Sequence, residues 1–332
     1  MSSRLDSNLD VTLNPATVFA PLLGQSQAVE LLTQAVIRDR LAPAYLFAGA
    51  DGVGRSLAAH CFIELLFSHS TAIPGKTRSP RLQQQNHPDL LWVEPSYLHQ
   101  GQRLSAAEAA AAGVKRKAPP QIRIEQIREI SRFLSRPPLE ASRSVVVIEQ
   151  AETMAEAAAN GLLKTLEEPG QATLILLAGG GESLLPTLVS RCQRIPFYRL
   201  PSTVMAEVLT QVGREEILQH PQVLAIAQGS PGAAIASWHQ LQNIPADLLQ
   251  ALTHLPQSSL REALDLARQI DQALDTEAQL WVVDYLQHGY WQIGNRRSQS
   301  LHFLERAKQS LRAYAQPRLV WEVTFMALCA AG

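Results

Sequence analysis

Apolar residues in the first two-thirds of the chain fall into short continuous runs separated by amphipathic segments. Such runs are typical of strands buried on both faces of a parallel sheet, whereas apolar residues spaced three and four apart indicate helices. We predict strands over residues 44–48, 90–93, 144–148, 174–178 and 195–198. We predict helices over residues 27–37, 56–67, 126–134, 155–168 and 184–189. This alternation predicts a doubly wound, five-stranded parallel sheet with ligands at the carboxyl ends of its strands.

After Pro201 the strand signal disappears and only helical spacing remains. Three short helices are predicted first, and beyond residue 245 the chain is helical to its end. An aromatic cluster over residues 281–291 is interpreted as helix packing rather than as an exposed interface. The pattern predicts an α/β domain followed by two helical domains, over residues 1–199, 200–244 and 245–332.

Two segments carry no such periodicity. Residues 1–16 read as a loose arm, and residues 99–120 form an alanine-rich stretch that ends in Lys115-Arg116-Lys117 and two prolines. Composition favours a solvated insertion or flexible loop for the second segment. The alternative is a small basic contact to DNA through Lys115, Arg116 and Lys117.

Overall composition narrows the class of protein. The formal net charge is −1, so the chain lacks the excess of positive charge expected of a protein that binds nucleic acid on its own. Three widely separated cysteines provide neither a disulfide framework nor a zinc module, so we expect a reducing cytoplasm and no zinc. No apolar run approaches the roughly 18 residues that span a bilayer, and the N-terminus lacks the apolar core of a signal peptide. We therefore expect a cytoplasmic protein with no membrane contact.

The first candidate site is a glycine-rich turn between a predicted strand and helix. Gly49-x4-Gly54-Arg55-Ser56 differs by one residue from a phosphate-binding loop, Gly-x4-Gly-Lys-[Ser/Thr]. In such loops the backbone N–H groups face the phosphates and the hydroxyl binds Mg²⁺. Gly49, Gly52 and Gly54 suit the turn, because glycine allows positive φ and close backbone approach. Arg55, however, places a planar guanidinium where a compact ammonium usually meets the phosphates.

The second candidate site follows the strand over residues 144–148, where a nucleotide hydrolase needs acidic groups. Glu149 could act as an outer partner of Mg²⁺. Gln150 cannot accept a proton, and a positioned general base is worth about 10²–10⁴ in rate. Gln150 and Arg55 together argue against ATP hydrolysis at this chain's own site. Binding of ATP or ADP with Mg²⁺, without turnover, stays an alternative.

Two further motifs carry a family resemblance. Residues 160–169 read Asn-Gly-Leu-Leu-Lys-Thr-Leu-Glu-Glu-Pro, and Ser190-Arg191-Cys192 follows. With these motifs the chain resembles the bacterial clamp-loader branch of the AAA+ ATPases, most closely the delta-prime subunits of DNA polymerase III. Supporting matches occur at residues 23–25, 49–56, 87–89, 122–128 and 229–232. The resemblance covers about residues 20–235, and the last hundred residues match only by their helical character.

The resemblance implies roles for individual residues. Arg191, between Ser190 and Cys192, resembles the arginine finger that reaches into a neighbouring subunit's ATP site. Gly232 stands where ATP-hydrolysing relatives carry a basic sensor residue in the lid. Many relatives carry four cysteines that bind zinc between the glycine-loop helix and the next strand; this chain has only Cys61 in that region, so we predict no zinc.

These observations lead to two main hypotheses. The first is a delta-prime-like subunit without intrinsic ATPase activity, which belongs to a DNA polymerase holoenzyme and hence to a nucleotidyltransferase complex. The resemblance implies a hetero-pentameric ring with gamma/tau motor and delta subunits, which loads a sliding clamp at primer–template DNA in the nucleoid-associated replisome. The alternative is an active, gamma/tau-like AAA+ ATPase. A small-molecule kinase of the phosphate-loop class is disfavoured by the helical C-terminal third and by the Ser-Arg-Cys motif.

Overall fold

The computed structural model describes residues 14–68, 86–112, 119–255, 259–292 and 298–331. The chain forms two compact units, which meet in sequence at Arg199 and Leu200. Most of the expected N-terminal arm, residues 1–13, and the basic residues Lys115, Arg116 and Lys117 lie outside the described residues. The three-domain division stays a prediction.

The first unit is built on a five-stranded sheet in which every neighbouring pair is parallel, in the order β2-β5-β6-β1-β7. The strands are β1 (Ala44–Ala48), β2 (Leu90–Val93), β5 (Ser144–Ile148), β6 (Ala172–Ala178) and β7 (Gln193–Pro196). The doubly wound architecture is therefore confirmed. The last strand begins two residues earlier than expected, because it lies at the edge of the sheet. Its exposed Gln193 and Arg194 interrupt the apolar run that marks an interior strand.

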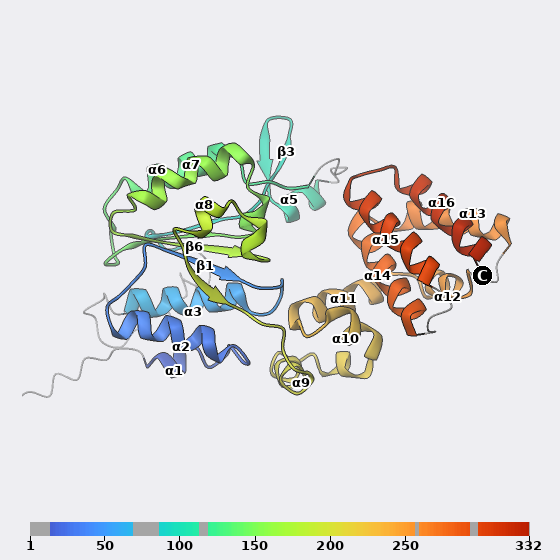
Figure 1. The fold of residues 1–332 in the computed structure, drawn as a ribbon, viewed down its shortest axis with the longest axis horizontal. Helices are drawn as coiled ribbons and strands as arrows, with labels where there is room; N and C mark the ends of the chain where they lie inside the picture. The colour runs from blue at the N-terminus through green and yellow to red at the C-terminus, as the bar shows by residue number, and fades with distance from the viewer. Residues whose placement is uncertain (1–13, 69–85, 113–118, 256–258, 293–297, 332) are drawn as a thin grey trace, which may run out of the picture. The chain divides into compact units, whose positions relative to one another are not determined.

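Helices cover both faces of this sheet, as Figure 1 shows. On β1, Tyr45 and Phe47 point to one face, while Ala44, Leu46 and Ala48 point to the other. The first face packs against α1 (Pro15–Val18), α2 (Ser26–Ile37) and α3 (Arg55–Ser68). The second face packs against α6 (Ile124–Leu134), α7 (Glu156–Glu167) and α8 (Pro186–Val189). Burial on both faces explains why the strands read as continuous apolar runs.

The first part of the insertion at residues 99–120 is not a flexible loop, one of the two expected forms, because it contains regular structure. Strands β3 (Tyr97–His99) and β4 (Gln102–Leu104) form an antiparallel hairpin, and α5 (Ala106–Ala111) follows. The turn residues Gln100 and Gly101 both have positive φ, 50° and 80°, as a two-residue hairpin turn requires. Gln-Gly is a weaker turn signal than Asn-Gly, and the strands are only three residues long, so the sequence pattern did not reveal them.

The second unit is helical and has two hydrophobic clusters. One lies among α9 (Ser202–Gln211), α10 (Pro221–Ala227), α11 (Pro231–Asn243) and a 3-10 turn at Glu215–Gln219. The other lies among α12 (Ala246–His254), α13 (Leu260–Ala273), α14 (Thr276–Gln292), α15 (Ser298–Arg312) and α16 (Pro317–Ala331). Trp281 and Tyr290 are buried as helix packing predicts, while Trp291 is exposed. In the described ranges, none of the helices combines the length and apolarity needed to cross a bilayer.

Candidate functional site

The glycine loop follows β1 and leads directly into α3. Gly49 cannot be replaced without a shift, because an added Cβ would lie 2.4 Å from the carbonyl oxygen of Phe197. Gly52 and Gly54 have φ of 73° and 104°, in the region that favours glycine. The loop therefore has the backbone shape expected of a phosphate-binding turn at a helix N-terminus.

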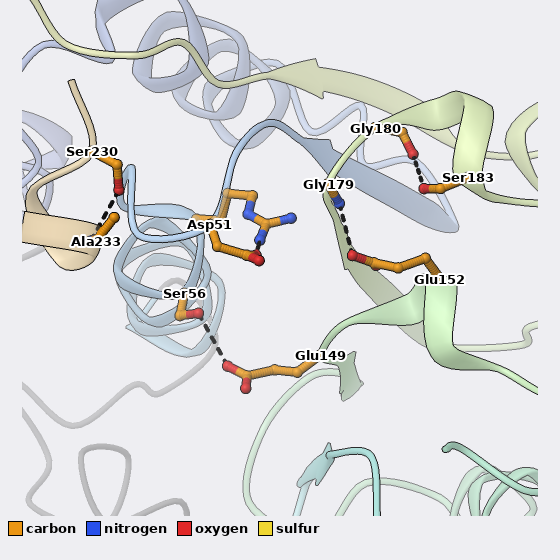
Figure 2. Close-up of polar contacts among 10 residues, drawn as sticks. Asp51, Ser56, Glu149, Glu152, Gly179, Gly180, Ser183, Ser230 and Ala233 are labelled. Carbon is orange, nitrogen blue, oxygen red and sulfur yellow. Dashed lines mark hydrogen bonds and ion pairs between the residues drawn. The ribbon is translucent and has the colours of Figure 1, made fainter. Parts of the chain in front are cut away.

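Arg55 is the first residue of α3, and its side chain is turned into its own loop. Only 7% of the Arg55 side chain is exposed, and its Nη2 forms an ion pair with Oδ1 of Asp51 (Figure 2). Its Nη1 is buried and has no hydrogen-bond partner among the described residues. The cation that stands in the lysine position is thus partly neutralised by a carboxylate of the same loop.

Ser56 and Glu149 are brought together by the fold. The hydroxyl of Ser56 donates to Oε1 of Glu149 at 3.0 Å, which joins the start of α3 to the end of β5 (Figure 2). In the sheet, β6 separates β1 from β5, so the contact spans three strands. A hydroxyl beside a carboxylate at this position fits the oxygen ligands that Mg²⁺ takes from a phosphate-loop site.

The negative charge of Glu149 affects the pKa of two nearby side chains, Glu94 and His60. Desolvation raises the pKa of Glu94, which follows β2, and the negative charge of Glu149 raises this pKa further. Burial lowers the pKa of His60, although Glu149 opposes that shift. His60 lies one helical turn after Ser56 and stacks on Trp92 with ring centroids 4.5 Å apart. Within the described ranges no three His, Cys, Asp or Glu side chains form a metal cluster.

Gln150, the predicted replacement for a general base, opens a tight turn. Its φ of 45° is left-handed, and its carbonyl accepts hydrogen bonds from the backbone N–H and the hydroxyl of Thr153 at 2.8 and 2.7 Å. Glu152, which was not a candidate residue, accepts from the backbone N–H of Gly179 at 3.2 Å and so connects the ends of β5 and β6 (Figure 2). Only the tertiary contact reveals that role, because one glutamate in a turn carries no pattern.

Gln25 is a second residue whose role the sequence did not reveal. It is 2% exposed, and its amide donates to the carbonyls of Val53 and Tyr198 at 3.1 and 2.7 Å. Its Oε1 accepts from the backbone N–H of Tyr198 at 3.1 Å. One buried amide thus ties the glycine loop to the segment after β7, which limits the movement of the loop.

Arg191 lies in the turn between α8 and β7. Its Nη1 donates to the carbonyl of Thr187 at 3.0 Å, and its Nη2 contacts Oε1 of Glu167 at 2.8 Å. The side chain is 38% exposed. Ser190 also donates to the Thr187 carbonyl, at 3.1 Å, and burial raises the pKa of the Cys192 thiol to about 11. Ser190 and Cys192 therefore support the turn, while Arg191 presents a guanidinium at the surface.

The glycine loop and Arg191 lie at opposite ends of the strands of the sheet. Strands β1 and β7 are parallel with Tyr45 beside Gln193, so Arg191 precedes the start of β7 while Gly49 follows the end of β1. At about 3.3 Å per residue, Gly49 is about 13 Å along the strand direction from the level of Tyr45 and Gln193. Arg191 and Glu149 therefore do not form one site within this chain.

Gly232, the remaining predicted difference, is the second residue of α11 in the second unit. The preceding Ser230 caps this helix by accepting from the N–H of Ala233 at 3.2 Å. A glycine at this position offers no side chain to a phosphate group.

Comparison with known proteins gives matches along most of the chain. Residues 24–201 match the family described as DNA polymerase III, delta subunit. Residues 203–328 match the family described as the C-terminal domain of cyanobacterial DNA polymerase III delta prime.

Among curated relatives, DNA polymerase III subunit delta' of Bacillus subtilis is 31% identical over 191 residues, 56% of this chain and 51% of the relative. The subunit delta' of Pseudomonas aeruginosa is 32% identical over 203 residues, 58% of this chain and 55% of the relative. The chain thus spans about half the length of these relatives. A DNA polymerase III gamma-subunit-related protein from Thermotoga maritima shares the fold, with a TM-score of 0.53 over 92% of this chain and 99% of that chain at 18% identity.

Proposed function

Because this chain belongs to the DNA polymerase III delta-prime family, we propose that it is the non-hydrolysing delta-prime subunit of a bacterial clamp loader. In that role it supplies Arg191 to the ATP site of a neighbouring motor subunit. The observation that carries this proposal is the contrast between two arginines. Arg55 is buried in an ion pair within its own loop, while Arg191 lies partly exposed at the opposite end of the strands.

The glycine-loop site of this chain is better suited to binding nucleotide than to hydrolysing it. The glycine loop and the Ser56–Glu149 pair suit Mg²⁺ with ATP or ADP. Hydrolysis also needs a base that takes a proton from water and a cation that meets the transferring phosphoryl group. Gln150 provides no base, Arg55 is engaged by Asp51, and Gly232 contributes no charge. Nucleotide would therefore be held without being cleaved.

The proposed role of Arg191 follows from phosphoryl-transfer chemistry. Charge builds up on the phosphoryl oxygens in the transition state, and a fixed guanidinium beside them stabilises that charge. Arg191 cannot perform this task for its own glycine loop, since the two lie at opposite ends of the strands. A neighbouring subunit's nucleotide is therefore the proposed target.

The proposed partners are gamma/tau motor subunits and a delta subunit in a hetero-pentameric ring. Helix α16 supports a collar role for residues 245–332, because Leu319, Val323 and Met326 are 56%, 54% and 38% exposed and are spaced four and three residues apart. This spacing places them on one helical face, as in a seam between two helices. On the same helix Arg318 and Glu322 pair at 2.8 Å, so these two charges offset each other. Through this ring the chain would take part in loading a sliding clamp at primer–template DNA in the cytoplasmic replisome.

The test is the activity of the reconstituted clamp loader. Arg191→Ala should leave assembly intact, because an exposed ion pair contributes only about 0–1 kcal/mol. Clamp- and DNA-stimulated ATP turnover should fall, and clamp loading should fall at least tenfold. Arg214→Ala, which removes another exposed and ion-paired arginine, is the control. Normal loading by the Arg191→Ala complex would remove the finger role.

The alternative function, an active gamma/tau-like motor, makes a different prediction. The purified chain would then hydrolyse ATP, and Arg55→Ala would abolish that activity. We expect no turnover above a buffer control. Robust turnover that depends on Arg55 would replace the proposed function with this alternative.

A further inference from the structure

Glu167 holds the guanidinium of Arg191 in place from within the same chain. It is the last residue of α7, 24 positions before Arg191, and their side chains meet at 2.8 Å. The Thr187 carbonyl holds the other terminal nitrogen at 3.0 Å. Both partners of the ion pair are partly exposed, Arg191 by 38% and Glu167 by 53%. The guanidinium is therefore oriented by two contacts and still reachable from outside.

We infer that Glu167 is a positioning residue for Arg191, an inference that rests on the proposed finger function. A carboxylate at the C-terminal end of a helix is disfavoured by the partial negative charge there. Glu167 therefore does not stabilise α7 by its position, and its ion pair with Arg191 offsets that cost. The pairing also connects residues 160–169 and the Ser-Arg-Cys motif, the two strings singled out in the sequence, at one point of the surface.

The contacts with Thr187 and Glu167 leave part of the Arg191 guanidinium available to bind phosphate. A guanidinium has five N–H donors in a fixed plane, and the contacts to Thr187 and Glu167 require only two. The other three donors make no hydrogen bond with the described residues, so they stay available for phosphoryl oxygens. An unrestrained arginine would lose about 2 kcal/mol of side-chain rotamer entropy on becoming ordered. Anchoring it beforehand removes part of that loss, which is how supporting contacts preorganise a catalytic group.

The expected effect is modest, because the ion pair is exposed. Glu167→Ala should lower the kcat for stimulated ATP turnover of the assembled complex about three- to tenfold. The KM for ATP should not change, because nucleotide binds to the neighbouring subunit. Glu167→Gln, which keeps an acceptor oxygen but loses the charge, should fall between Glu167→Ala and the unmodified chain.

The experiment uses complexes reconstituted with the gamma/tau and delta subunits of the same organism. The variants are Glu167→Ala, Glu167→Gln, Arg191→Ala and the Glu167→Ala/Arg191→Ala double variant. Glu168→Ala removes the adjacent exposed carboxylate and is the matched control. Complex mass and the melting temperature of the chain show whether assembly and folding are preserved. The double variant should be no slower than Arg191→Ala alone.

The outcomes distinguish a failure of the positioning role of Glu167 from a failure of the finger role of Arg191. One outcome is that the complex with Arg191→Ala turns over ATP slowly while the complex with Glu167→Ala turns it over at least as fast as the unmodified complex. In that case the positioning role is wrong and the finger role survives. If Glu167→Ala slows the Arg191→Ala complex further, or raises KM, Glu167 acts through something other than Arg191. If Arg191→Ala is normal, the proposed function fails, and the inference fails with it.

Discussion

Asp51 and Arg55, four positions apart where the glycine loop leads into α3, form an ion pair, and the two partners differ sharply in exposure. The Asp51 side chain is 74% exposed, whereas Arg55 is 7% exposed and keeps one buried nitrogen without a partner among the described residues. The carboxylate thus lies where the loop meets solvent, in front of the buried guanidinium. An arriving phosphate would meet a negative charge on the same loop before it could engage Arg55.

Removing that charge should improve nucleotide binding. We expect Asp51→Asn to bind ADP or pyrophosphate about tenfold more tightly, since two charges about 4 Å apart near a protein surface interact by several kcal/mol at most. Isothermal titration of the purified chain measures the change. Asp265→Asn, an equal change in charge on the surface of the second unit, is the control.

An Asp51→Asn variant that binds no better than the unmodified chain would show that Asp51 does not oppose anions. The same conclusion would follow if Asp265→Asn tightened binding equally, because the effect would then be one of net charge.

Magnesium dependence tests the contact between Ser56 and Glu149. If the chain holds nucleotide through this pair, Mg²⁺ should tighten ADP binding, and Ser56→Ala should reduce that Mg²⁺ effect at least fivefold. Titrations with Mg²⁺ and with EDTA measure it. Ser68→Ala, at the other end of α3, is a suitable control because the Ser68 hydroxyl donates to the carbonyl of Leu65 within the same helix. An unchanged Mg²⁺ effect in Ser56→Ala would exclude the serine as a ligand.

Asp89 makes the stability of the first unit depend on pH. Burial raises the pKa of Asp89, but hydrogen bonds from the backbone N–H groups of Leu139, Ala141 and Glu140 and the charge of His87 together lower it by more, so the net shift is downward. The three N–H contacts are 2.6 to 2.7 Å long. Asp89→Ala leaves these donors without their acceptor, so we expect a loss of about 2–4 kcal/mol in the free energy of unfolding.

The pH dependence follows from the lowered pKa of Asp89. A carboxyl whose folded pKa lies below its unfolded value of about 3.9 stabilises the fold above that pH and loses the contribution as pH falls through the folded pKa. The stability gap between the unmodified chain and Asp89→Asn should therefore be full near neutral pH and shrink below about pH 4. Urea denaturation from pH 3 to 7 measures the gap. A constant gap would contradict the linkage.

Helix α16 should mediate assembly through its apolar face. Val323→Glu places a charge in the centre of the exposed row formed by Leu319, Val323 and Met326, so it should weaken the complex without unfolding the monomer. Size-exclusion chromatography with light scattering reports assembly, and circular dichroism reports folding. Leu260→Glu, at another 55% exposed leucine in the same unit, is the matched control. Full assembly of Val323→Glu would place the interface elsewhere.

The sequence predicted most of the fold because its signals are local. The apolar run at residues 144–148 records burial on both faces of a strand, and the structure has β5 at Ser144–Ile148. The start of edge strand β7 was predicted two residues too late, because its polar Gln193 and Arg194 do not continue the apolar run. The β3–β4 hairpin was missed because its strands are short and its Gln100-Gly101 turn is not a strong signal.

The amino-acid sequence by itself determined the alternation of strands and helices, the glycine loop, the glutamine at position 150 and the family to which the motifs point. Tertiary structure alone decided which side chains meet. Ser56 and Glu149 are 93 positions apart, and Arg191 and Glu167 are 24 apart, so no periodicity could pair them. Periodicity reports which residues are buried along one element, whereas a contact between elements depends on strand order and helix placement, which exist only after folding.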